Sequence, residues 1–314
     1  MMNKLIGLAI GLAIPASVAL ACVEGEPGIF PPNTMNIPAL PYKTIQEDMF
    51  NQVITRAEKF YTPVFKAQGQ TFKVNRLWSD GTVNASAQRQ GSNSIVNMYG
   101  GLARHALVTA DAFTLVLCHE IGHHLGGVPK VTSIFSSSWA SDEGQSDYFA
   151  TLKCAREMFK DDDNQAIMSK VAVPALVTEK CQKTFNASGD IALCQRSAMA
   201  GAALANTLGS LSNLPETKFD TPDSSTVSKT NHAHPAAQCR LDTYFAGAIC
   251  EVSKDDLLSD TDETLGTCNV QMSFETGVRP LCWFAPATAT PPTPEPSPDP
   301  REPTPPSGGT WPSE

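Results

Sequence analysis

The residues most suited to chemistry lie in the stretch Cys118-His119-Glu120-Ile121-Gly122-His123-His124. On a helix, residues four apart lie on the same face, so His119 and His123 have the spacing that two ligands of one Zn²⁺ need. The intervening Glu120 can then act as the general base that takes a proton from water. Apolar residues from Leu107 to Leu117 predict a largely buried helix, in which two imidazoles and a carboxylate are costly unless they are paired or bind a metal. The alternative is a surface helix with satisfied histidines.

A third protein ligand leaves one position of a catalytic zinc ion for water. Glu143 follows after residues 124 to 142, which suffice for a loop and a return on a second helix. Asp147 lies four residues further on the same face, where it can accept a hydrogen bond from the second ring nitrogen of a ligand histidine. The alternative is two solvated acids at a helix start, where the helix dipole favours them. That alternative explains each acid but not their joint spacing after the histidines.

In its motifs the chain resembles the gluzincin metallopeptidases, and among them the group of HtpX, Oma and the CAAX-prenyl endopeptidases. The likeness covers about residues 80 to 245. It is carried, in chain order, by Val83-Asn-Ala-Ser-Ala87, Asn97-Met-Tyr-Gly-Gly-Leu102, His119-Glu-Ile-Gly-His-His124, Glu143-Gly-Gln-Ser-Asp-Tyr-Phe-Ala150, and His234-Pro235 with Arg240.

The resemblance implies that His119, His123 and Glu143 bind a single catalytic Zn²⁺. It also implies that Glu120 is the base and that Asp147 supports a ligand. The expected reaction is hydrolysis of peptide bonds in a protein or peptide substrate.

The same resemblance implies that His234 and Arg240 lie near the site, where they would stabilise the oxyanion of the transition state or fold over the metal and block it. Two departures matter. Ala233 stands where the family often has Thr, and His232 makes the assignment of His234 ambiguous. The chain also lacks the family's membrane-spanning helices, which favours the family's soluble exported branch.

Hydrophobic periodicity predicts the elements that position these residues. We expect an α+β fold of zincin type, with helices around a small antiparallel sheet and the cleft between the sheet edge and the HExxH helix. The 94–99 strand is the expected edge, able to hold an extended peptide by strand addition. The expected helices are 43–67, 103–125, 141–159, most of 164–213 and one after Pro235, and the expected strands, in an antiparallel meander, are 71–78, 82–88 and 94–99.

The two ends of the chain differ from its middle. Residues 1–21 read as a secretory signal peptide with a small-x-small cleavage site. Residues 22–42 are a proline-punctuated extended lead-in, 43–284 the metallopeptidase domain, and 285–314 a disordered proline-rich tail. Cys22 fits either a lipid anchor, which would be the chain's contact with a membrane, or plain cleavage before it. We therefore expect an exported protein that is periplasmic, anchored to the outer membrane or secreted.

Composition excludes some partners and predicts cross-links. A formal net charge of −9 argues against a nucleic-acid partner. Of nine cysteines, eight remain without Cys22, an even number that suggests disulfides in an exported chain. The short-loop pairs Cys181–Cys194 and Cys268–Cys282 are the simplest pairings. A Cys239–Cys250 bond is excluded if both lie on one helix, about 16 Å apart along its axis.

Two other functions stay open at this level. The chain could be a latent or chaperone-like exported protein that keeps its zinc site and rarely cleaves. It could also be a disulfide-stapled binding protein without a metal.

Overall fold

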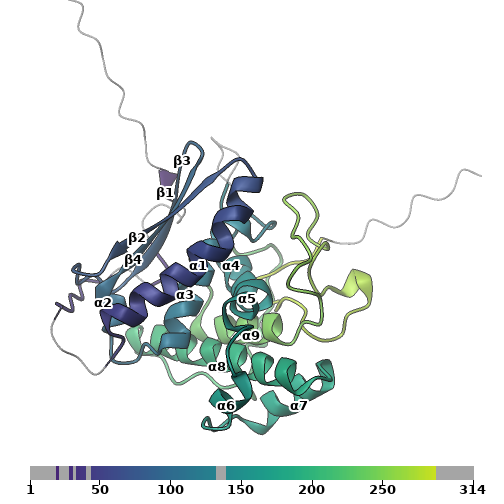
Figure 1. The fold of residues 1–314 in the computed structure, drawn as a ribbon. Helices are drawn as coiled ribbons and strands as arrows, with labels where there is room; N and C mark the ends of the chain where they lie inside the picture. Colours follow the sequence, from purple (N-terminus) through teal and green to yellow (C-terminus); the bar gives the residue numbers. More distant parts are fainter. Residues whose placement is uncertain (1–18, 21–27, 31–32, 40–43, 132–138, 288–314) are drawn as a thin grey trace, which may run out of the picture.

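The computed structural model describes residues 19–20, 28–30, 33–39, 44–131 and 139–287. The described chain has an α+β fold (Figure 1). Most of the predicted signal peptide and of the proline-rich tail, as well as Cys22, lies outside these residues. Within the predicted lead-in, Ile29 and Phe30 are buried in the main hydrophobic core, so the core extends upstream of residue 43.

The sheet consists of β1 (Ala19–Leu20), β2 (Thr71–Leu77), β3 (Ala85–Gln90) and β4 (Asn93–Tyr99), in the order β1-β3-β4-β2. β3 and β4 form an antiparallel hairpin about Gly91, which has a left-handed φ of 60°. β2 instead runs parallel to β4. The predicted antiparallel meander is therefore wrong, and the sheet is mixed.

The reason lies in the Ser79-Asp80-Gly81 stretch, which does not close a hairpin. The carbonyls of Asp80 and Thr82 accept hydrogen bonds from the amides of Gly101 and Leu102, 2.9 and 3.1 Å away. The chain thus leaves the sheet after β2 and re-enters on the far side of β4. As a result β4 is an inner strand, and the prediction that 94–99 forms the exposed edge is wrong.

The first helices cover the sheet. α1 (Glu47–Ala67) buries Phe50, Ile54, Ala57 and Phe65 at helical spacing and packs on β2. The predicted 103–125 helix is interrupted, because α2 (Gly100–Ala103) ends early and the Thr109 side chain caps a new helix by accepting from the amide of Ala112. This second helix, α3 (Ala110–Leu125), ends before Gly126-Gly127 as predicted. It contacts β3 and β4 as well as α8, and it lies between them in Figure 1.

The remaining helices build the other side of the molecule. The predicted 141–159 helix is a continuous rod made of α4 (Glu143–Phe149), the π-helical turn η1 (Ala150–Cys154) and α5 (Ala155–Phe159). The bounds of the others are α6 Asn164–Met168, α7 Ala175–Thr184, α8 Ser188–Leu211, α9 Ala237–Ala248 and the 3₁₀ turn η2 Val270–Met272. α9 packs against both α8 and α4.

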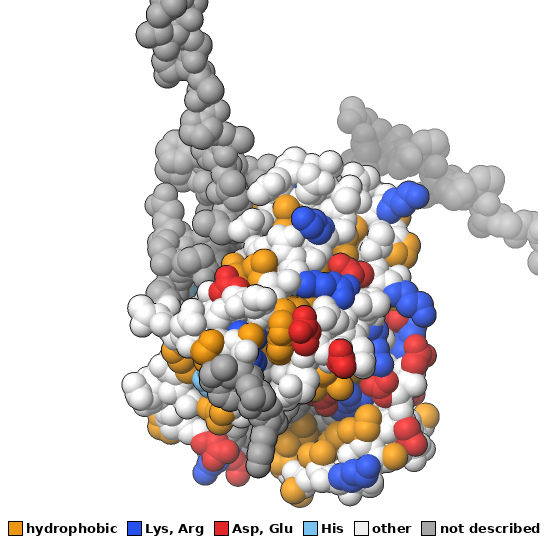
Figure 2. Space-filling view, turned by 60° about the vertical axis from the view of Figure 1, so that its left-hand side comes forward, with side chains coloured by type: hydrophobic (Ala, Val, Ile, Leu, Met, Phe, Trp, Pro, Cys, Tyr) orange, Lys and Arg blue, Asp and Glu red, His pale blue; other side chains and the backbone are white. Residues whose placement is uncertain are grey.

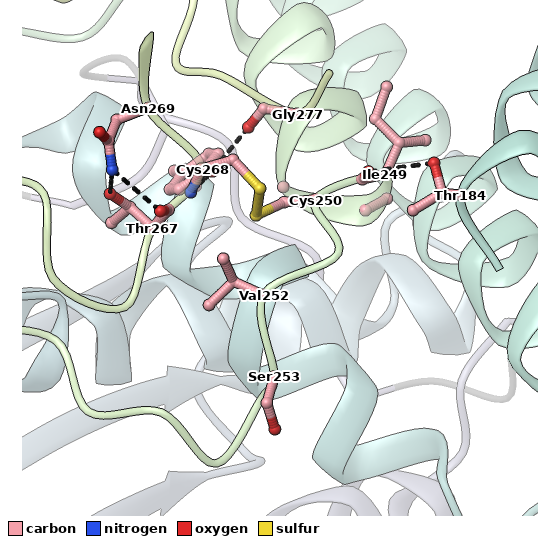
Figure 3. The surroundings of a disulfide bond; sticks show 12 residues. Thr184, Ile249, Cys250, Val252, Ser253, Thr267, Cys268, Asn269 and Gly277 are labelled. Atoms are coloured by element: carbon pink, nitrogen blue, oxygen red, sulfur yellow. Dashed lines mark hydrogen bonds between the residues drawn. A yellow bond between two sulfur atoms is a disulfide. The ribbon is translucent and has the colours of Figure 1, made fainter. Parts of the chain in front are cut away.

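Four disulfides link these elements: Cys118–Cys154, Cys181–Cys194, Cys239–Cys282 and Cys250–Cys268. The predicted Cys181–Cys194 pair is confirmed, as is the exclusion of Cys239–Cys250. The predicted Cys268–Cys282 pair is wrong. Cys268 is bonded to Cys250, which follows the last turn of α9 (Figure 3). This bond links the segment that carries Thr267 and Asn269 to the end of that helix.

The disulfides suggest an oxidising, exported environment. Within the described ranges, no helix combines the length and the apolar character that a membrane crossing requires. On the face seen in Figure 2, acidic and basic side chains are interspersed and not gathered by sign.

Candidate metal centre

The HExxH helix is buried, as its apolar sequence predicted. His119, Glu120 and His123 on α3 are each at most 1% exposed. The ring of His119 lies edge-on to that of His123, with centroids 4.8 Å apart. The neighbouring His124 points elsewhere and stacks on Trp139, which gives it a structural role. The spacing of the two histidines thus brings both imidazoles to one place beside a buried carboxylate.

The second helix supplies the third group. On the first turn of α4, the Glu143 carboxylate lies 3.1 Å from His119 Nε2 and 3.6 Å from His123 Nε2. One ligand atom from each of the three residues lies within 4.8 Å of the others, so this group could bind a metal ion. The close approach of α4 to α3 depends on Gly122, where a Cβ would lie 2.9 Å from Ser146 Cα.

The other ring nitrogens are already engaged. His119 Nδ1 lies 2.7 Å from Asp147 Oδ1, and His123 Nδ1 lies 2.9 Å from the carbonyl oxygen of Ser141. Such partners hold a histidine in one tautomer and one orientation. With Nδ1 used in both rings, the two Nε2 atoms are left to face the same centre as Glu143.

Asp147 connects His119 to two further side chains, those of Arg240 and Tyr244. Its carboxylate, fully buried, accepts two hydrogen bonds of 2.7 Å from the guanidinium of Arg240 and one of 2.6 Å from the Tyr244 hydroxyl. Arg240 also donates to the carbonyl of Ile29. Sequence analysis placed Arg240 near the site, and it lies there; since its guanidinium is 2% exposed and faces Asp147, it positions the carboxylate and does not face solvent.

His234 is also at the site. Its Nε2 lies 3.2 Å from Glu143 Oε2, and its side chain is 17% exposed, more than that of any of the three grouped residues. It therefore lies on the more open side of the cluster. Two residues earlier, His232 Nδ1 lies 2.8 Å from Oδ1 of the buried Asp142.

Among the side-chain contacts, sequence reasoning missed those of Tyr244 and of His232. Tyr244 could have been found from its place four residues after Arg240, on the same helical face. The pairing of His232 with Asp142 had no sequence signal beyond the residue types.

Burial and charge set the protonation of the cluster. Burial has the largest effect on each group, and it raises the pKa of Glu120 to about 8 and lowers that of His123 to about 4. Burial also lowers the pKa of His119, but the carboxylates of Asp147 and Glu143 outweigh it and raise this pKa to about 9. The surrounding histidines hold the pKa of Glu143 well below its usual range, against the effect of burial. Without a metal, both His119 and Glu120 therefore carry a proton near neutral pH, and a metal ion must displace the proton of His119 to bind there.

Comparisons with protein families, with curated proteins and with solved structures give no match to this chain.

Proposed function

We propose that the protein is a zinc-dependent endopeptidase of the gluzincin type. The observation that carries the proposal is the convergence of His119 Nε2, His123 Nε2 and the Glu143 carboxylate beside Glu120. Glu120 is 1% exposed, and its Oε1 has no hydrogen-bond partner among the described residues. A carboxylate buried in this way is costly unless something else in the site engages it.

The donor set fits zinc. Two imidazole nitrogens and one carboxylate are the protein ligands of a class of catalytic zinc sites that keep a fourth position open. Asp147 behind His119 and the Ser141 carbonyl behind His123 are the supporting contacts that such ligands need. The resemblance to the HtpX, Oma and CAAX-prenyl endopeptidase group in the HExxH, ExxxD and HPxxxxR blocks supports the same assignment.

When bound, zinc would lower the pKa of a water molecule and polarise the scissile carbonyl. The chain's own residues would do the rest. The Glu120 carboxylate would take a proton from the attacking water and pass it to the leaving amine. The pair of Asp147 and Arg240 would hold His119 in place throughout.

The proposed substrate is a protein or peptide in extended conformation. Since β4 is an inner strand, the candidate edge is β3, on which α3 packs. Ala19–Leu20 pair with β3 in antiparallel register, opposite Arg89 and Gln88, so this edge accepts an added strand. In the mature chain that we propose, cleavage after Ala21 removes this segment and leaves the edge to a substrate. Export to the periplasm, the outer membrane or the medium, with or without a lipid on Cys22, belongs to the same proposal.

A latent zinc protein is the second candidate, and one observation favours it. His234 lies close enough to Glu143 to compete for the open position of an ion held there. If it blocks that position, His234→Ala raises basal hydrolysis. If it donates to the oxyanion, the same change lowers hydrolysis roughly 10²–10³-fold.

The Glu120→Gln variant tests the proposal. The amide is nearly isosteric and cannot act as a base, so we expect turnover of an unfolded protein substrate to fall roughly 10²–10⁴-fold. Because Glu120 is not a ligand, zinc content and the melting temperature should stay close to wild type. His105→Gln, outside the helices, is the matched control. Unchanged hydrolysis by Glu120→Gln, with contaminating proteases excluded, would contradict the proposal.

A further inference from the structure

The segment 227–234 carries both His232 and His234, and we call it the histidine arm. Its first part is held by the C-terminal segment 281–285. The amide of Val227 donates to the carbonyl of Leu281 at 2.9 Å, and that of Asn231 donates to the carbonyl of Trp283 at 2.8 Å. The C-terminal segment is itself cross-linked to α9 through Cys239–Cys282. The arm therefore starts from a fixed position.

The end of the arm crosses the start of α4. There, His232 reaches Asp142 at 2.8 Å and His234 reaches Glu143 at 3.2 Å. Two histidines two residues apart thus contact two consecutive acids, while Ala233 between them is exposed. The contact of His234 is with a proposed zinc ligand, whereas the contact of His232 is one residue away from it.

Asp142 depends on His232. Its side chain is fully buried, and its Oδ2 has no hydrogen-bond partner among the described residues. Among the described residues, the partner of this carboxylate is His232, which bonds to its Oδ1. A buried carboxylate with one partner holds that partner firmly, because losing it leaves the carboxylate unsatisfied.

We propose that the His232–Asp142 pair is a latch that positions the His234 imidazole at the metal ligands. His232 is a positioning residue, and it acts through His234. One residue of extended chain spans about 3.3–3.6 Å, so release of His232 lets the imidazole two positions on move by several ångströms, enough to reach or leave an ion. The latch rests on the metal site of the proposed function but not on peptide hydrolysis.

The test is a double-mutant cycle read out on the metal. Co²⁺ is loaded into the full mature chain, and its visible spectrum and dissociation constant are measured for wild type, His232→Ala, His234→Ala and the double variant. We expect each single change to alter the spectrum and to shift the Co²⁺ dissociation constant in the same direction, by about 10-fold, as for the loss of a supporting contact. In the His234→Ala background, His232→Ala should change it less than about twofold, since residues that act as one unit are not additive.

A conservative variant separates positioning from folding. His232→Asn places an amide N–H near the position of the imidazole Nδ1, so it should keep the wild-type spectrum and affinity. His105→Ala is the control for loss of a histidine elsewhere. Equal effects of His232→Ala in both backgrounds, or no effect in the wild-type background, would overturn the latch. A wild-type chain that binds no Co²⁺ would overturn both the latch and the proposed metal site. A non-additive cycle in a chain that hydrolyses no peptide would uphold the latch and reject only the peptidase.

Discussion

Replacing Asp147 by Asn tests how the site is supported. Its carboxylate accepts hydrogen bonds from His119, from two nitrogens of Arg240 and from Tyr244, and it is fully buried with Arg240. The guanidinium holds the pKa of Asp147 below its usual range, against the effect of burial. The aspartate is therefore charged, and it is the counterion of a buried cation.

The expected loss follows from that burial. Removing one partner of a buried ion pair costs about 3–5 kcal/mol, because the other charge stays behind unpaired. At about 2–4 °C per kcal/mol for a domain of this size, the melting temperature of the metal-free protein should fall by roughly 6–20 °C. Separately, loss of the anionic partner of His119 should weaken zinc binding roughly 10- to 100-fold.

Thermal denaturation of the metal-free chain and competition with a zinc chelator measure the two effects. Asp111→Asn is the matched control: Asp111 pairs with Arg196 but is 29% exposed, so its loss should cost under about 1 kcal/mol. The double variant Asp147→Asn with Arg240→Met should be less destabilised than the sum of the single changes, by about 0.5–3 kcal/mol. Additive losses, or a stable Asp147→Asn variant with wild-type zinc affinity, would show that Asp147 supports neither Arg240 nor His119.

Two further predictions concern stability. Burial lowers the pKa of His124 to about 3, below its ordinary 6.5, so between these pH values the unfolded chain binds the proton that the folded chain excludes. Acidification should therefore destabilise the metal-free wild type more than His124→Gln, by up to about 1.4 kcal/mol per pH unit, in urea titrations from pH 7 to 4; equal slopes would contradict this. Replacing Cys118 and Cys154 by Ala should cost about 2–5 kcal/mol and also weaken zinc binding, because this bond ties the ligand helix α3 to the rod that carries α4. Replacing Cys181 and Cys194, which lie on α7 and α8, by Ala should lower stability without changing zinc affinity. If the two double variants bind zinc equally well, the Cys118–Cys154 bond does not support the site.

Much of the candidate site was predictable because helical spacing is local. An α-helix has about 3.6 residues per turn, so residues four apart share a face. This places His119 with His123, and Glu143 with Asp147, whatever surrounds them. The position of Arg240 came from the resemblance. The contact between His232 and Asp142 was not predictable, since it depends on where the loop after α8 returns to α4, and no local rule sets that path.

The fold was predictable as a set of elements more than as an arrangement. Strand patterns indicated all three main strands but not their pairing. That pairing is decided by hydrogen bonds that the amides of Gly101 and Leu102, at the start of α2, donate to the carbonyls of Asp80 and Thr82. Loop length predicted the Cys181–Cys194 bond correctly but failed for Cys268 and Cys282, for the same reason. Cys268 and Cys282 are close in sequence, yet packing of the C-terminal segment on α9 brings Cys250 to one and Cys239 to the other.

Whether hydrolysis depends on the metal decides if His119, His123 and Glu143 form a catalytic zinc site. The purified protein is assayed on an unfolded protein substrate as isolated, after removal of metal by a chelator, and after return of one equivalent of Zn²⁺. We expect hydrolysis to be lost with the metal and restored by zinc, and neither step to affect a Glu143→Ala chain, which should bind no zinc. Hydrolysis that persists in the metal-free chain, or a zinc-loaded chain that hydrolyses no peptide bond, would contradict this assignment.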